Sequence, residues 1–509
     1  MCTSGSDVAH ALVRAAFATP GDARITAANR CREKFRHGTH ECVRHMRLDS
    51  MGLLIKNADI VTADSRYRAD VYCEDETITS IGPNLGAPPD AEVIDASGKL
   101  LFPGFIDPHV HIYLPFMATF AKDTHETGST AALIGGTTTY IEMCCPSRLD
   151  DALEGYQLWK SKAEGSSACD YTFHMSVTKF GDQTEGQLRE IVADGIASFK
   201  IFLAYKNFFG VDDGEMYQTL QLAKKLGVIV TAHCENAELV GRLQQSLLAQ
   251  GKTGPEWHEP SRPQVVEAEG TNRFATFLGV TGAAGYVVHL SCKDALEAAL
   301  AARSRGVKIW IESVLPHLLL DKTYAERAGV EGMKHVMSPP LRSRENQKVL
   351  WEALAAGSID TVGTDHCPFD TSQKLLGKEA FTQIPNGIPG IEERVSLLYT
   401  YGVKRGNLDL HRFVDAASTR AAKLFGLHPR KGTIAIGSDA DLVLFDPEYR
   451  GKIFAATQHT NCDYSGFEGM EIEGRPSIVT VRGKVQVRDG KFVGERGRGR
   501  LLKREPSYF

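Results

Sequence analysis

Eight short apolar runs, each followed by a stretch with helical spacing, constrain the fold of this chain more than any other feature of its sequence. The intervals between them, for example 216–226 and 295–305, place apolar residues three and four positions apart, which is typical of helices that bury one face. Eight strand-then-helix units predict a parallel (β/α)8 barrel of the TIM type, an α/β fold. The predicted strands are 105–111, 137–143, 171–177, 198–203, 228–234, 286–291, 307–312 and 360–365.

Short strands separated by turn residues lie near both ends of the chain. Neither group has enough strands to bury one face of a sheet by itself, so we expect both groups to form one small β-sandwich together. The predicted strands are 53–57, 69–72, 78–81 and 92–94 in the first group, and 440–445, 478–481 and 484–487 in the second. The expected domain limits are 51–102 for the first part of the β-sandwich, 103–430 for the barrel and 431–490 for the second part of the β-sandwich.

Two segments flank these domains, and the first of them, residues 1–50, has no clear helical or strand period. We expect residues 1–50 to form a disordered extension without a catalytic role. An organelle transit peptide, or an upstream start codon with the protein beginning near Met51, are the alternative interpretations. Residues 491–509 are rich in arginine, and a solvated or subunit-bridging tail is expected there.

Composition indicates which partners and which cellular setting to expect. The formal net charge of -5 gives no reason to expect nucleic acid or an anionic membrane as a partner, and no uninterrupted apolar stretch approaches the roughly 18 residues that span a bilayer. The 11 cysteines are dispersed and form no CxxC pair, which favours a reducing, cytoplasmic setting over a disulfide framework. We interpret Cys234, Cys292 and Cys367 as small buried thiols, with metal coordination as the alternative.

Polar residues that commonly bind metals end several of the predicted strands. His109 and His111 alternate on the first strand, so both imidazoles point to the same side and can hold one metal ion. His233 and His289 each follow a valine-rich run, and Asp365 ends the eighth strand. Because the carboxyl ends of barrel strands meet at one mouth, we expect these side chains to form a two-metal site. Three further histidines are expected around the site or at the surface: His125, His174 and His366.

Lys200 lies in the apolar strand 197–203, where an ammonium group is costly to bury. Such a lysine can extend to solvent or pair with a carboxylate. Burial also lowers the pKa of a lysine, and the neutral amine can then react with carbon dioxide to give a carbamate that bridges two metal ions. The histidines and the aspartate at the neighbouring strand ends favour the carbamate.

From about Gly52 to Arg500, the sequence resembles the dihydropyrimidinase/hydantoinase branch of the amidohydrolase superfamily. Segment 437–443 is common to many amidohydrolases, whereas the lysine strand, 338–342 and 384–387 are much more specific. The segments that carry the resemblance are 103–111 (PGFIDPHVH), 135–138 (GGTT), 198–207 (SFKIFLAYKN), 338–342 (SPPLR), 363–369 (GTDHCPF), 384–387 (IPNG) and 437–443 (GSDADLV).

The resemblance implies a hydrolase with two zinc ions in each chain. It implies that His109, His111 and Asp365 hold one zinc ion and that His233 and His289 hold the other. Lys200, carboxylated on its side-chain nitrogen, would bridge the pair. A hydroxide shared by the two zinc ions would attack the ring carbonyl carbon, and Asp365 would carry its proton to the leaving ring nitrogen. The substrate would be a dihydropyrimidine or a 5-substituted hydantoin, and the product an N-carbamoyl amino acid.

The resemblance also implies the residues that bind the ring. Tyr205 corresponds to a phenol that stabilises the oxyanion, and Ser338 and Asn386 correspond to positions whose backbone groups read the cyclic ureide. Apolar loop residues would surround the ring substituent, although aromatic residues in the core are the alternative interpretation; these are Phe116, Phe202 and Phe209. A homotetramer is expected from the resemblance alone.

Three other functions compete with this interpretation. A dihydroorotase of the similar type would carry an arginine where this chain has Tyr113, and without that cation an anionic ring is a poor substrate. An allantoinase remains open, because its substrate is also an uncharged ureide. A non-catalytic structural relative would have lost metal ligands, whereas this chain retains all six positions. Segments 112–116, 123–126 and 142–146 depart from the usual pattern of the branch, which predicts an altered preference for the ring substituent.

Overall fold

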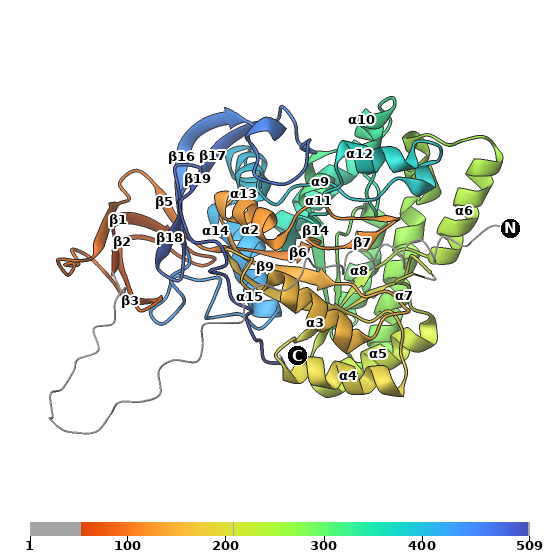
Figure 1. Ribbon diagram of the computed structural model, residues 1–509, viewed down its shortest axis with the longest axis horizontal. Helices are drawn as coiled ribbons and strands as arrows, with labels where there is room; N and C mark the ends of the chain where they lie inside the picture. Colours follow the sequence, from red (N-terminus) through yellow and green to blue (C-terminus); the bar gives the residue numbers. More distant parts are fainter. Residues whose placement is uncertain (1–51, 207, 507–509) are drawn as a thin grey trace, which may run out of the picture.

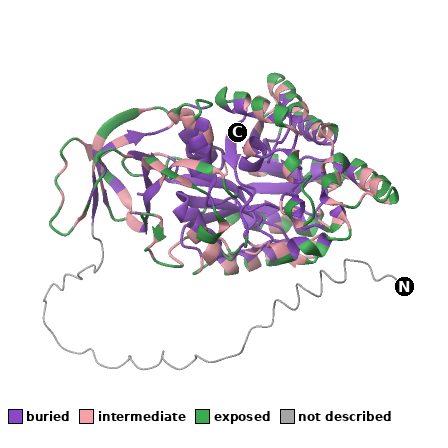
Figure 2. Ribbon diagram, turned by 90° about the horizontal axis from the view of Figure 1, so that it is seen from above, coloured by how far each residue is buried: buried purple, intermediate pink, exposed green. Residues whose placement is uncertain are grey.

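The structure, a computed structural model, describes residues 52–206 and 208–506. The expectations for residues 1–50 therefore lie outside the described residues. A sheet built from both ends of the chain lies on one side of the molecule, and a barrel surrounded by helices lies on the other (Figure 1). Buried residues concentrate in the barrel strands, while exposed residues lie mainly on the outer helices and on the far edges of the terminal sheet (Figure 2).

The central barrel has the eight parallel strands that the sequence predicts. Consecutive strands pair in chain order, so that neighbours in sequence are neighbours in space. Most of their residues are buried on both faces, as the continuous apolar runs require. The strands are β6 (Phe105–Val110), β9 (Thr137–Cys144), β10 (Asp170–Ser176), β11 (Ser198–Phe202), β12 (Ile229–His233), β13 (Gly285–Val287), β14 (Ile309–Val314) and β15 (Thr361–Gly363).

The barrel closes between its first and last strands through only a few bonds. Asp365 donates its backbone N–H to the His109 carbonyl at 3.0 Å, and His111 donates to the His366 carbonyl at 2.7 Å. Below them, the Thr364 hydroxyl donates to the buried Asp107 carboxylate at 2.6 Å. These bonds place the end of β15 directly beside His109 and His111, at the end of β6.

Helices follow the strands and cover the outside of the barrel. A capping box begins α5, because Asp212 accepts from the Glu215 N–H at 2.8 Å while Glu215 accepts from the Asp212 N–H at 3.0 Å. The same helix ends at Gly227, whose φ of 68° is a left-handed conformation that glycine adopts without steric cost. The principal helices are α2 (His125–Ile134), α3 (Ala152–Ala163), α4 (Asp182–Ala193), α5 (Asp213–Leu226), α6 (Ala237–Ala249), α7 (Gln264–Thr281), α8 (Lys293–Ser304) and α11 (Arg344–Ala355).

Shorter helices lie over the strand ends and after the last barrel strand. Between α6 and α7, the proline-rich segment 254–263 forms two single 3-10 turns, η1 (Pro255–Trp257) and η2 (Glu259–Ser261). A two-stranded hairpin of β7 (Pro115–Phe116) and β8 (Thr119–Phe120) follows β6. The short helices include α9 (Leu315–Leu319), α10 (Val330–Met333), α12 (Thr371–Lys374), α13 (Arg394–Leu398), α14 (Leu410–Val414) and α15 (Arg420–Leu424).

The second domain joins the two ends of the chain in one nine-stranded sheet. The junction is the antiparallel pair β5–β16, in which Val443 lies opposite Phe102. Its small core combines Ile55 and Val71 from the first group with Leu442 from the second. The strands are β1 (Leu53–Val61), β2 (Arg66–Glu74), β3 (Thr77–Gly82), β4 (Glu92–Asp95), β5 (Leu100–Pro103), β16 (Leu442–Lys452), β17 (Glu471–Val481), β18 (Lys484–Arg488) and β19 (Lys491–Phe492).

A buried ionic cluster joins this sheet to the barrel. Lys431 donates to Asp170 on β10 and to Asp441, both at 2.7 Å, and lies 3.0 Å from Asp439. Arg482, at the end of β17, pairs with the same Asp170 carboxylate. The opposite charges therefore compensate one another away from solvent.

The segment around Arg504 packs along the barrel strands. Arg504 is buried and donates to the Phe173 carbonyl at 2.5 Å and to the Ser198 hydroxyl at 2.9 Å. The expectation of a solvated tail is therefore wrong for Leu502 and Arg504, whose positions on the barrel exclude water. Among the helices in the described ranges, none is both long and apolar enough to cross a membrane.

Candidate active site

A cavity at the carboxyl ends of the barrel strands brings together nearly all of the predicted site residues. His109 lies immediately beneath it, with its Nε2 atom 3.2 Å from the Asp365 carboxylate. The residues that line the cavity are His111, Leu114, Phe116, Lys200, Phe202, Tyr205, Phe209, His233, His289, Ser338, Asp365, Cys367, Asn386 and Gly387.

His109, His111 and Asp365 form a compact group of metal-binding type. Their ligand atoms lie within 4.8 Å of one another, and the Asp365 oxygen that faces His109 is also 3.3 Å from His111 Nε2. Burial lowers the pKa of His111 to about 4, so the imidazole is neutral and can act as a ligand. Burial alone would raise the pKa of Asp365, but hydrogen bonding and electrostatic attraction from the neighbouring His109, His111 and Lys200 outweigh it and lower that pKa to about 2.

Glu312, on β14, orients the first of these histidines. Its carboxylate accepts from His109 Nδ1 at 2.7 Å, which leaves His109 Nε2 to face Asp365. The same carboxylate accepts from the His289 backbone N–H and from the Tyr286 hydroxyl, both at 2.9 Å. Glu312 was not identified from the sequence, in which a carboxylate within an apolar strand is its only signal.

His233 and His289 form the second group. Their Nδ1 and Nε2 atoms, respectively, lie 2.9 Å apart, so both nitrogens point to one place in the cavity. His233 Nε2 is held at 2.7 Å by Glu235, whose carboxylate also accepts from Arg262 at 2.5 Å. Burial opposes the charge of Glu235, but Arg262 and His233 outweigh it and lower the pKa of this carboxyl to about 2. Glu235 and Arg262 were also not identified from the sequence.

Lys200 points into the same cavity from β11. The residue is wholly buried, and its Nζ atom has no hydrogen-bond partner in the described part of the chain. Burial lowers the pKa of Lys200 to about 8, although Asp365 opposes the shift. A buried amine without a partner is unfavourable unless a further group completes it. The unpaired Nζ atom, together with His109 Nε2, which is buried and makes no hydrogen bond, therefore fits a site built for metal ions.

Three residues of the site have left-handed backbone conformations although none is glycine. The φ angles are 55° at Tyr205, 41° at His289 and 51° at Asp365. Such conformations cost free energy and cluster at functional sites, where the surrounding structure enforces them. Each of these residues follows a barrel strand closely, and the turn in the backbone directs its side chain into the cavity.

Tyr205, Ser338 and Asn386 meet at one wall of the cavity. Asn386 Nδ2 donates to the Ser338 hydroxyl at 3.0 Å and lies 3.5 Å from the Tyr205 hydroxyl. Burial raises the pKa of Tyr205, which keeps the phenol protonated and able to donate. The structure thus brings together the three residues that the resemblance assigns to the ring, although they lie far apart in the sequence.

The three predicted aromatic residues form the apolar wall. Phe209 stacks between Phe202, at a ring-centroid distance of 5.2 Å, and Phe116, at 6.0 Å. Phe116 also meets the edge of the Tyr205 ring at 5.3 Å. These side chains line the cavity and also pack in the core. They can therefore be core residues and still surround a ring substituent.

Cys367 lines the cavity, whereas the other histidines and cysteines expected around the site do not; these are His125, His174, His366, Cys234 and Cys292. His366 pairs with Asp123 at 2.8 Å, and His174 contacts the Ser198 hydroxyl at 2.7 Å. Burial raises the pKa of the Cys234 and Cys367 thiols, which disfavours the thiolate form that metals bind. The cysteines of the described ranges are all free and buried, in agreement with the first interpretation.

Of the three segments whose sequences differ from the usual pattern of the branch, only 112–116 lines the cavity. Leu114 and Phe116 line it, whereas Glu142 is buried behind β6 and accepts from the Tyr113 backbone N–H at 2.9 Å. Tyr113 itself packs against Trp159, with ring centroids 5.3 Å apart. The departure that bears on the ring substituent is therefore segment 112–116.

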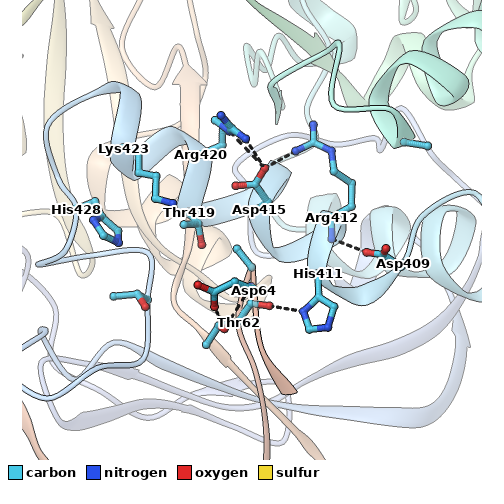
Figure 3. Close-up of a pocket in the computed structure, with 13 residues that line it drawn as sticks. Thr62, Asp64, Asp409, His411, Arg412, Asp415, Thr419, Arg420, Lys423 and His428 are labelled. Carbon is cyan, nitrogen blue, oxygen red and sulfur yellow. Dashed lines mark hydrogen bonds and ion pairs between the residues drawn. The ribbon is translucent and has the colours of Figure 1, made fainter. Parts of the chain in front are cut away.

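A larger cavity of about 430 Å³ lies away from these residues, between the end of β1 and helices α14 and α15 (Figure 3). Its charged groups largely neutralise one another, since Asp415 accepts from both Arg412 and Arg420. The acidic group Asp170, Asp439 and Asp441 likewise surrounds the Lys431 ammonium, which takes the place that a cation would need. Neither place resembles the site at the barrel mouth.

Comparison with known proteins agrees with this geometry. The amidohydrolase family model matches residues 100–486. A D-hydantoinase of Geobacillus stearothermophilus is 46% identical over 456 residues, which cover 89% of this chain and 97% of that protein. A dihydropyrimidinase of Rattus norvegicus is 39% identical and covers 89% of each chain.

Solved structures show the same similarity in three dimensions. The structure of a D-hydantoinase (dihydropyrimidinase) from Thermus sp. superposes with a TM-score of 0.89 at 81% identity, over 90% of this chain and all of that one. An L-hydantoinase (dihydropyrimidinase) from Arthrobacter aurescens superposes with a TM-score of 0.82 at 31% identity, over 89% of this chain and 99% of that one. The chain therefore belongs to the amidohydrolase family, in its hydantoinase and dihydropyrimidinase branch, and is a cyclic amidohydrolase.

Proposed function

We propose that the protein hydrolyses the ring amide of a neutral cyclic ureide, a dihydropyrimidine or a 5-substituted hydantoin, to an N-carbamoyl amino acid. Two zinc ions, bridged by carboxylated Lys200, would serve the reaction. The observation that carries this proposal is the buried, unpartnered Lys200 Nζ atom in a cavity that four histidines and one aspartate border. The names of the relatives supply the class of substrate.

The zinc ligands follow from the two groups of side chains. His109, His111 and Asp365 would hold one ion, and His233 with His289 would hold the other. When bound, two zinc ions lower the pKa of a shared water so that a nucleophile exists near neutral pH, and they polarise the carbonyl under attack. The residues behind the ligands, Glu312 and Glu235, keep the imidazoles in the required tautomer.

The chain itself supplies orientation and proton transfer. Asp365 stays ionised, so it accepts the proton of the attacking water and delivers it to the ring nitrogen as the C–N bond breaks. The Tyr205 hydroxyl donates to the oxyanion that develops on the ring carbonyl. Ser338 and Asn386 hold the ureide ring, and the Phe116, Phe202 and Phe209 wall excludes water around the substituent.

The cavity wall favours an uncharged ring. Among the described residues that line it, none is an arginine, and Lys200 is the one cationic side chain. A carboxylate-bearing ring would thus lack a partner, and Tyr113, which packs beside Trp159, supplies no cation for it.

Turnover and metal content test this proposal together. Zinc-loaded protein should hydrolyse dihydrouracil, dihydrothymine or a 5-substituted hydantoin and should contain about two zinc ions per chain. Lys200→Ala should lose the bridging ligand, so that its turnover falls by about a thousandfold or more and its zinc content decreases. Lys348→Ala, at an exposed position on α11, is the matched control.

Three results would contradict the proposal. Wild-type turnover by Lys200→Ala with zinc supplied would remove the carbamate from the reaction. Activity confined to allantoin would overturn the substrate and leave the metal site, while a folded protein without zinc or turnover would indicate a non-catalytic relative. A homotetramer in the cytoplasm remains a prediction, which light scattering of the purified protein and cell fractionation would test.

A further inference from the structure

Lys374, the last residue of α12, is a charged side chain that the proposed reaction does not use. The residue is wholly buried. Its Nζ atom donates to three backbone carbonyls, those of Pro385 and Gly387 at 2.7 Å and that of Val336 at 3.0 Å. Among the described residues, no carboxylate lies within ion-pair distance of it, and its Nζ atom lies 5.9 Å from the centre of the Phe369 ring.

The three carbonyls belong to the two segments that form the ring-binding wall. Pro385 and Gly387 flank Asn386, and Val336 lies two residues before Ser338. The same segments are also joined by the Gly387 N–H, which donates to the Val336 carbonyl at 3.0 Å. The ammonium group thus links both segments from behind, while Asn386 and Ser338 face the cavity.

The chemistry of the contact requires the charged form. Only an ammonium has three N–H groups for three acceptors, because a neutral amine has two. Burial works against the charge and lowers the pKa of Lys374 to about 7. A methionine of similar length would fill the same space without this cost. The charge of Lys374 is therefore explained by its three hydrogen bonds and not by packing alone.

We propose that Lys374 is a positioning residue for the substrate ring, which holds segments 336–338 and 385–387 at the spacing that the cyclic ureide requires. This inference rests on the proposed function, since it concerns the same ring. Lys374 does not touch the cavity; it acts through the carbonyls on either side of Asn386. Because the ring contacts are made equally before and during the reaction, their loss should weaken binding more than it slows chemistry.

Steady-state kinetics of Lys374→Met test the inference. We expect KM to rise by about tenfold or more with a much smaller change in kcat, since displaced binding groups lose affinity steeply with distance. The factor should be the same for dihydrouracil and for 5-phenylhydantoin, because the lysine holds the groups that read the ring and not those around its substituent. Zinc content should not change. Lys378→Met, an exposed lysine four residues away, is the control.

A second measurement keeps the inference separate from the choice of substrate. Hydrogen exchange should become faster in Lys374→Met at peptides that span 336–342 and 384–388, and should remain unchanged in Lys378→Met. If wild-type protein turned over no cyclic ureide, the proposed function would fail, and the exchange result alone would decide whether Lys374 holds the two segments. Unchanged exchange and unchanged KM in folded Lys374→Met would overturn the inference. A parallel loss of kcat, zinc and thermal stability would also overturn it, because that pattern describes general damage.

Discussion

Carboxylates behind the histidines determine which imidazole nitrogens face the cavity. Glu312 accepts from His109 Nδ1, and Glu235 accepts from His233 Nε2. Each bond fixes a tautomer, so the remaining nitrogen carries a lone pair for a metal ion. Glu312 does more than this, because it also holds the His289 backbone and thereby links both ligand groups.

Replacing the carboxylate by an amide should loosen the site without emptying the space. In Glu312→Gln, the side chain keeps its volume but loses the charge that holds His109 Nδ1–H. We expect zinc affinity and kcat/KM to fall by about 10- to 100-fold. Zinc retained after dialysis against a chelator, measured beside activity, checks this. Glu297→Gln, an exposed change on α8, should match wild type; equal zinc retention in both variants would contradict the role of Glu312.

Single residues show where sequence reasoning succeeds and where it ends. The metal-binding residues were predictable because they end apolar strands or lie in recognisable segments, as His109, Lys200 and Asp365 do. The burial of Lys374 was not predictable, because its segment SQKLLGK has the polar composition of a surface turn. Only the tertiary structure buries it. Glu312 was hidden because its partners, His109 and His289, come from other strands.

At the scale of the elements, β6 and β15 are joined by only a few hydrogen bonds. Parallel neighbours elsewhere in the barrel share a ladder, but here a few bonds around Asp107 perform the closure. Asp107 is buried and accepts from the Thr364 hydroxyl at 2.6 Å, with Arg394 nearby at 3.7 Å. Burial raises the pKa of this carboxyl, with Arg394 opposing, so each hydrogen bond to it matters.

Thr364→Val should therefore weaken the closure. Valine has the shape of threonine but cannot donate, so it leaves one Asp107 oxygen without that bond. The free energy of unfolding should fall by about 1–3 kcal/mol, and the melting temperature should fall with it. Thr276→Val, at an exposed position on α7 where the hydroxyl bonds within its own helix, is the control. A melting temperature equal to that of the control would show that other bonds suffice.

The barrel elements were predictable to within a few residues because parallel strands buried on both faces leave long apolar runs. Their helices were visible from their periodicity. Strand β5 was not predicted, since it lies directly before the glycine and the next apolar strand, and the two read as one run. The β7–β8 hairpin has only two residues in each strand and is formed by its place over the cavity rather than by its own propensity.

At the scale of the molecule, one ionic cluster joins the barrel to the terminal sheet. Burial alone would raise the pKa of Asp170, but Lys431 and Arg482 outweigh it and lower that pKa to about 2. The charged residues of the cluster come from three places: β10, the segment before β16 and the end of β17. Separation of the two domains would thus expose several charges at once.

This cluster predicts how stability depends on acid. Because the pKa of Asp170 is lower in the folded than in the unfolded protein, its contribution is present above about pH 4 and is lost as the pH falls towards 2. Melting temperatures between pH 7 and pH 2 should therefore fall more steeply in wild type than in Asp170→Asn, which is already weakened at pH 7. Asp90→Asn, in an exposed loop, should follow wild type; identical curves for all three would remove Asp170 from the explanation.

The pairing of β5 with β16 also determines when the terminal sheet can form during translation. Roughly 340 residues separate these neighbours, and a ribosome that adds about 5–20 residues per second needs on the order of 20–70 s to produce them. Throughout that interval, the edge of β5 has no strand to pair with, and the apolar face of β1 and β2 has no partner to cover it. The newborn chain must therefore keep this edge of the sheet unpaired until β16 has been synthesised.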